Sequence, residues 1–174
     1  MENPTYPVGK HAIIYGLYLS VALIILSLIS YVLDLYKYSW AGYIGYAFLL
    51  VGVAVSSIHY RNKYIGGFIA YGKSVSVGFL TGLFASVVLA IFTLIFMSVL
   101  GEEYRQTLLQ MTEEKILSSN PEITDDQLDM ALNITEKMMK PGWMSIVSLL
   151  AYTLFSLIFS LIASIFIKKE EPVE

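Results

Sequence analysis

The sequence has 174 residues, of which 56% are hydrophobic and only 14% are charged, and its mean hydropathy is +0.66. Soluble domains carry about 25% charged residues, so this composition excludes an ordinary soluble globular protein. The chain contains no cysteine, which excludes disulfides and thiolate metal ligands. A net charge of −3 gives no reason to expect nucleic acid as a partner.

Four stretches of the chain lack Asp, Glu, Lys, Arg and His, and each is about as long as a membrane-spanning helix. They cover residues 12–33, 40–58, 74–100 and 143–167. A helix needs about 20 residues to cross the ~30 Å hydrocarbon core of a bilayer. The stretches do not alternate apolar with polar residues, as the strands of a membrane β-barrel would. The sequence therefore predicts a single all-α integral membrane domain over residues 1–174, with four transmembrane helices in a bundle.

The distribution of cations predicts how these helices are oriented. An even number of spans places both termini on one side, and Lys and Arg are enriched in short cytoplasmic loops. The side of the termini carries six cations close to the membrane: Lys10, Arg61, Lys63, Lys73, Lys168 and Lys169. The other side carries five, and four of those are spread over the 42 residues of segment 101–142. We therefore expect both termini in the cytoplasm.

Segment 101–142 is acidic and is predicted to form a helical hairpin outside the membrane. It holds nine acidic and four basic residues, and Asn120-Pro121 is a turn signal that divides it. Thr124 and Gln127 match the spacing of a capping box, which starts a helix. Apolar residues at helical spacing then form a candidate partner face: Leu128, Ala131, Leu132, Met138 and Met139. Pro141-Gly142 ends this helix just before the last span.

Small residues recur about every fourth position in two of the spans. Such residues let helix backbones approach closely in a membrane, and hydroxyl groups can bond across the contact. The third span has Gly78, Gly82, Ser86 and Ala90, and the fourth has Ser148, Ser156, Ser160 and Ser164. We interpret both sets as helix-packing residues within the bundle, although either face could instead dock a partner or a second copy. Replacing Gly82 by leucine should disrupt the close contact.

Two patterns that resemble chemical sites have simpler explanations. Residues 125–129 match the DDxxD motif that binds magnesium and diphosphate, but they also form the negative first turn of a helix facing its macrodipole. His11 and His59 both lie at the predicted inner boundary, without the further ligands that a metal site needs. We predict no catalytic residue, no metal site and no cofactor, and therefore no enzyme.

The order of several short motifs resembles a known family. The motifs are Tyr15-Gly16-Leu17, Tyr60-Arg61, Gly66-Gly67-Phe68-Ile69, Tyr71-Gly72, Gly78, the Thr124–Gln127 helix start and the closing Lys168-Lys169. Together they resemble the domain-of-unknown-function family 4199, small four-helix membrane proteins found mainly in Bacteroidota. The resemblance implies a multi-pass protein of the bacterial inner membrane, and it supplies no activity, ligand or catalytic position.

The sequence leaves two functions open. The first is a non-enzymatic accessory or scaffold subunit that acts through helix–helix and loop contacts with a membrane-protein partner or a second copy, within the lipid bilayer. The second is an oligomeric facilitator or channel for a small solute, with the Ser148–Ser164 stripe lining the path. The two functions predict different positions for that stripe. In a scaffold subunit it packs against the third span, and in a channel it lines a water-filled cavity.

Overall fold

The computed structural model describes residues 6–38, 40–99 and 101–169. Over these residues the fold is all-helical and contains no named strand, which confirms the predicted fold class. Its elements are α1 (Val8–Val32), the short 3-10 helix η1 (Leu35–Lys37), α2 (Ala41–Tyr64), α3 (Tyr71–Val99), α4 (Gly101–Ser119), α5 (Asp125–Met138) and α6 (Pro141–Ile167).

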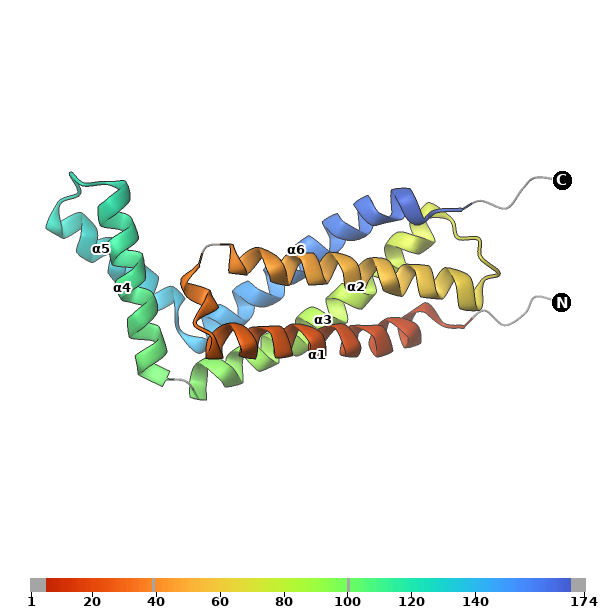
Figure 1. Ribbon diagram of the computed structural model, residues 1–174, viewed down its shortest axis with the longest axis horizontal. Coiled ribbons are helices and arrows are strands. Elements are labelled where there is room, and N and C mark those ends of the chain that lie inside the picture. The colour runs from red at the N-terminus through yellow and green to blue at the C-terminus, as the bar shows by residue number, and fades with distance from the viewer. Residues whose placement is uncertain (1–5, 39, 100, 170–174) are drawn as a thin grey trace. The chain divides into compact units, whose positions relative to one another are not determined.

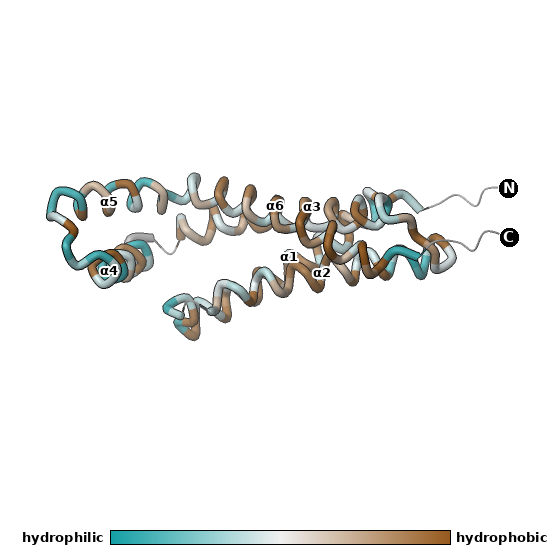
Figure 2. The backbone as a smooth tube through the Cα atoms, turned by 90° about the horizontal axis from the view of Figure 1, so that it is seen from above, coloured by the Kyte–Doolittle hydropathy of each residue, from teal (hydrophilic) through white to brown (hydrophobic). Residues whose placement is uncertain are grey.

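Four of these helices, α1, α2, α3 and α6, are long and apolar enough to cross a membrane. Figure 2 shows hydrophobic residues dominating them, while hydrophilic residues gather at their ends and along α4 and α5. Helix α2 runs on to Tyr64 and α3 already starts at Tyr71, so the connector is shorter than the gap between the charge-free stretches 40–58 and 74–100. A charge-free stretch gives only the apolar part of a helix, and each of these helices continues into the polar residues beside its stretch. Gly66 and Gly67 make the turn with φ angles of +65° and +90°, which glycine adopts without strain.

The chain divides into two compact units, residues 1–89 with 149–174 and residues 90–148. In the first unit α1, α2, α3 and α6 share one apolar core (Figure 1). Helices α1, α2 and α3 each give two buried residues to it: Leu19 and Leu23, Leu49 and Val53, Ala85 and Leu89. Tyr152, Phe155 and Phe159 of α6 pack against these residues. The four helices therefore bury a common apolar interior.

The start of α1 and the end of α6 lie at the same end of the first unit (Figure 1). A second apolar cluster there joins Tyr60, Ile69, Val77 and Ile167, with Val8 packed against it. Ile69 and Lys169 exchange backbone hydrogen bonds of 2.8 and 3.0 Å, and the Arg61 guanidinium donates to the carbonyl oxygen of Ile167 at 2.8 Å. These contacts tie the α2–α3 connector to the end of α6.

The turn between α1 and α2 is held by a local ion pair. Asp34 adopts a left-handed backbone conformation with φ of 54°, and its carboxylate lies 3.1 Å from the Lys37 ammonium. Hydrogen bonds from Lys37 first, and then from Tyr36, lower the pKa of Asp34 below its usual range. The turn brings α1 and α2 together as an antiparallel hairpin.

Candidate functional site

The small residues of α3 and α6 form a tight seam between these two helices. A methyl group on Gly82 would overlap the Cβ of Ser156, and one on Gly78 would lie 2.8 Å from the Oγ of Ser160. Ser156 and Ser160 are buried, so both predicted stripes meet face to face over this part of the helices. The absence of side chains at the two glycines lets the helix backbones approach each other.

Hydroxyl groups bond across the same seam. Ser164 donates to the hydroxyl of Ser74 at 2.8 Å, and the hydroxyls of Ser86 and Thr153 lie 2.9 Å apart. Ser86, Ser156 and Ser160 also donate to carbonyl groups of their own helices, Ser156 to that of Thr153 at 2.9 Å. The polar atoms of the seam therefore satisfy one another and the helix backbones. Such bonds stabilise helix association in a membrane by about 0.6 kcal/mol on average.

The two remaining predicted packing residues, Ala90 and Ser148, belong to the second unit. Ala90 is buried, and its carbonyl oxygen accepts a hydrogen bond of 2.7 Å from Ser145, a residue that the sequence analysis did not single out. Ser148 is only half-buried, unlike the other three serines of its stripe. The close contact thus spans Ser74 to Ser86 on α3 and Thr153 to Ser164 on α6.

His11 lies inside the first unit instead of at its surface, which the sequence did not predict. Its side chain is 1% exposed, and its Nε2 lies 3.0 Å from the carbonyl oxygen and 3.2 Å from the hydroxyl of Ser56. The Ser56 hydroxyl is in turn 2.7 Å from that of Thr81, which donates to the carbonyl of Val77. This chain of polar groups links α1, α2 and α3. The sequence shows only that His11 lies just before an uncharged stretch. That position does not identify Ser56 as its hydrogen-bond partner.

Aromatic rings surround His11 at the same end of the unit. The His11 ring stacks on that of Tyr15 at a centroid distance of 4.3 Å and lies 5.9 Å from that of His59. The Tyr60 hydroxyl donates to the carbonyl oxygen of Tyr6 at 2.7 Å, and the Lys73 ammonium lies 5.9 Å from the centre of the Tyr60 ring. No group of three His, Cys, Asp or Glu side chains that could hold a metal occurs in the described part of the chain. The cluster is suited to packing and to anchoring at a membrane surface.

In the second unit, α4 and α5 form the predicted hairpin. The capping box is present: Thr124 Oγ accepts from the Gln127 amide at 3.4 Å, and the Gln127 side chain accepts from the Thr124 amide at 3.3 Å. Asp125 and Asp126 follow in the first turn, where a negative charge faces the helix dipole. This geometry agrees with reading the DDxxD motif as a helix start.

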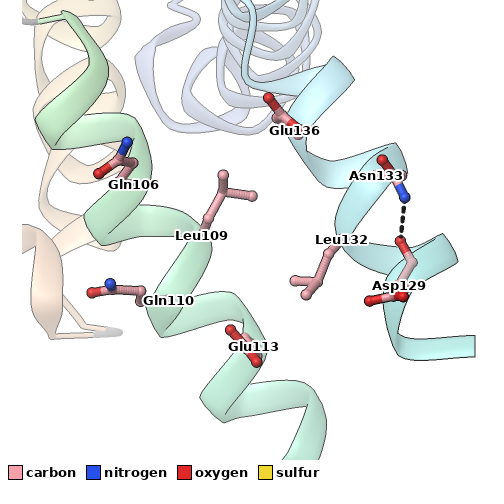
Figure 3. A pocket seen from close by; sticks show the side chains of 8 residues that line it. All are labelled: Gln106, Leu109, Gln110, Glu113, Asp129, Leu132, Asn133 and Glu136. Atoms are coloured by element: carbon pink, nitrogen blue, oxygen red, sulfur yellow. Dashed lines mark hydrogen bonds between the residues drawn. The ribbon is translucent and has the colours of Figure 1, made fainter. Parts of the chain in front are cut away.

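The candidate partner face of α5 divides in two. Leu132 points into the space between the two helices of the hairpin, opposite Leu109 of α4, as Figure 3 shows. Polar side chains from both helices complete the lining of this groove of about 280 Å³: Gln106, Gln110, Glu113, Asp129, Asn133 and Glu136. Leu128, Ala131 and Met139 are also half-buried, whereas Met138 is 49% exposed. Met138 ends an exposed row at four-residue spacing that also contains Met130 and Ile134, two residues outside the predicted face.

One comparison with known proteins gives a match. The sequence model of a family described as "Protein of unknown function (DUF4199)" matches residues 14–169, nearly the whole chain. The predicted resemblance is therefore confirmed. No curated protein and no solved structure matches the chain.

Proposed function

The chain belongs to the DUF4199 family, whose function is unknown, and we propose that it is a non-enzymatic accessory or scaffold subunit of the bacterial inner membrane. In this role it binds a membrane-protein partner through the outer surfaces of its helices and its hairpin. The observation that carries the proposal is the burial of the serine stripe: Ser156, Ser160 and Ser164 face the glycines and hydroxyls of α3. A stripe engaged in this way is unavailable to line a solute path within one copy of the chain.

The outer surface of the helices supports a role through contacts. Large apolar side chains are exposed along all four long helices, as a lipid or a partner helix requires. On the hairpin, Met130, Ile134 and Met138 form an exposed apolar row on α5, and Met130 is the most exposed of the three at 66%. Exposed apolar side chains on a polar helix are typical of contact sites for other proteins.

We propose the predicted orientation, with both termini in the cytoplasm. Cationic side chains and aromatic rings pair at the end of the first unit where α1 starts and α6 ends. The ammonium groups of Lys63, Lys73 and Lys169 lie 5.3–5.9 Å from the centres of aromatic rings. Lysine and arginine are enriched on the cytoplasmic side, whereas aromatic rings occur at both interfaces, so the lysines carry this assignment. Labelling of single cysteines introduced at Lys63 and at Glu114 in intact cells tests this orientation, since only the position outside the cytoplasm should react.

Purification of the tagged full-length chain from native membranes in mild detergent tests the scaffold role. We expect a second membrane protein at a fixed ratio that resists high salt. Met130→Ser should reduce its recovery, because the substitution removes exposed apolar surface without touching the packing of α4 on α5. Glu114→Ser, at an exposed position of α4, is the matched control and should leave recovery unchanged.

Two results would contradict the proposal. One is recovery of this chain alone as a defined oligomer. The other is flux of small neutral solutes through reconstituted liposomes above that of protein-free vesicles, the behaviour of an oligomeric facilitator.

A further inference from the structure

An open groove of about 640 Å³ lies where α5 ends and α6 begins. Ile134, Lys137 and Met138 line it from α5, and Lys140, Gly142 and Trp143 complete it. The apolar side chains in it are open to the outside: Ile134 is 53% exposed, and Met138 and Trp143 are each 49% exposed. Lys137 and Lys140 are both exposed at its edge. The groove thus joins an apolar floor to two positive charges.

The charges of this groove contrast with those of the segment around it. Segment 101–142 has nine acidic residues and four basic ones, and two of those four line the groove. No acidic side chain is among the six lining residues, whereas three line the groove between α4 and α5. The local charge is therefore positive within an acidic segment, which favours an anionic ligand.

The groove also lies at the start of a candidate membrane span. Helix α6 begins at Pro141, and Trp143 is its third residue. Tryptophan is enriched where a span meets the headgroup layer, because its ring is apolar and its N–H is polar. One turn further along α6, Ile146 and Val147 are 49% and 45% exposed, so the apolar surface continues from the groove along the helix. A ligand with a charged head and a long apolar tail would cover both the groove with its two lysines and the apolar surface along α6.

We propose that this groove binds an anionic phospholipid, with the phosphate beside Lys137 and Lys140 and the upper acyl chain over Met138 and Trp143. The lysine ammonium groups supply the charge attraction, and the apolar floor supplies the hydrophobic contact. A soluble acidic peptide would match the lysines but not the apolar surface that continues along α6. The proposal concerns the headgroup layer beside the hairpin and holds for either orientation of the chain.

Quenching of Trp143 fluorescence by brominated lipids tests the proposal. The full-length chain has two tryptophans, so Trp40→Phe leaves Trp143 as the one reporter. The protein is reconstituted into phosphatidylcholine vesicles that contain increasing fractions of brominated phosphatidylglycerol, or of brominated phosphatidylcholine as the neutral reference. We expect the anionic lipid to quench at lower mole fraction. A lysine close to an anionic headgroup contributes about fivefold to binding, so Lys137→Gln with Lys140→Gln should reduce the preference about 25-fold.

The matched control removes the same charge at the other end of α6. Lys168→Gln with Lys169→Gln should leave the preference of the Trp143 site unchanged, and Lys137→Arg with Lys140→Arg should retain most of it. Equal quenching by both lipids in the parent protein would overturn the proposal. So would an equal loss of preference in both double-glutamine variants, because the effect would then reflect net charge and not this groove.

Discussion

Replacing Gly82 by alanine tests the seam between α3 and α6 with one methyl group. That methyl would overlap the Cβ of Ser156 and lie 2.8 Å from its Oγ and 3.5 Å from its backbone Cα. Ordinary van der Waals contact begins at 3.4 Å, so even the hydroxyl would be too close by about 0.6 Å. A serine has no long side chain that could swing away, so the helix backbones themselves must separate.

The expected cost follows from this geometry. Overpacking a well-packed contact costs about 1–3 kcal/mol. Separation of the helices would also stretch the bonds between Ser86 and Thr153 and between Ser164 and Ser74, which are now 2.8–2.9 Å long. Alanine also favours the helix over glycine by up to about 1 kcal/mol, and this gain partly offsets the destabilisation from overpacking. A control variant in the same helix corrects for part of this gain in helix propensity.

Gly72→Ala is that variant, because Gly72 lies in the same helix and a methyl group there would meet nothing within 4 Å. Reversible unfolding by SDS in mixed micelles, followed by circular dichroism, gives the free energies of unfolding. We expect Gly82→Ala to be less stable than Gly72→Ala by about 1–3 kcal/mol. Gly82→Leu should have a still lower free energy of unfolding. Equal stability of the two alanine variants would refute the close contact.

Three further changes probe other parts of the chain. His11→Phe keeps a ring of similar size but loses the hydrogen bonds to Ser56, and it should lower the free energy of unfolding by about 1–3 kcal/mol in the same SDS titration. Thr124→Ala removes the helix cap of α5 and should cost about 1 kcal/mol, seen as about fivefold faster hydrogen exchange in its first turn. Lys37→Gln should raise the pKa of Asp34 toward its usual value in an NMR titration. The stabilisation from the Asp34 pair is present above the pKa of an unfolded aspartate and is lost as pH falls through the lower pKa of the folded state.

Several features of this protein follow from the sequence alone. The number and type of the long helices are read directly from charge-free stretches, because a segment of about 20 apolar residues has few stable alternatives to a helix. The cap at Thr124 is equally local, since both of its hydrogen bonds join residues three positions apart. The spacing of glycine and serine also indicated which faces of α3 and α6 carry only small side chains, so that the two helices can pack closely there.

Other features were decided only by the tertiary structure, because they depend on which distant residues meet. Nothing in the sequence pairs His11 with Ser56, 45 residues away, or shows that this histidine is buried between the helices. Helical periodicity placed Leu132 and Met138 on one apolar face of α5, but α4 covers only part of it. Leu132 is turned toward Leu109, while Met138 stays exposed in the groove with Trp143. Periodicity fixes the direction of a side chain about its own helix axis, and the neighbouring helix decides whether that direction is buried.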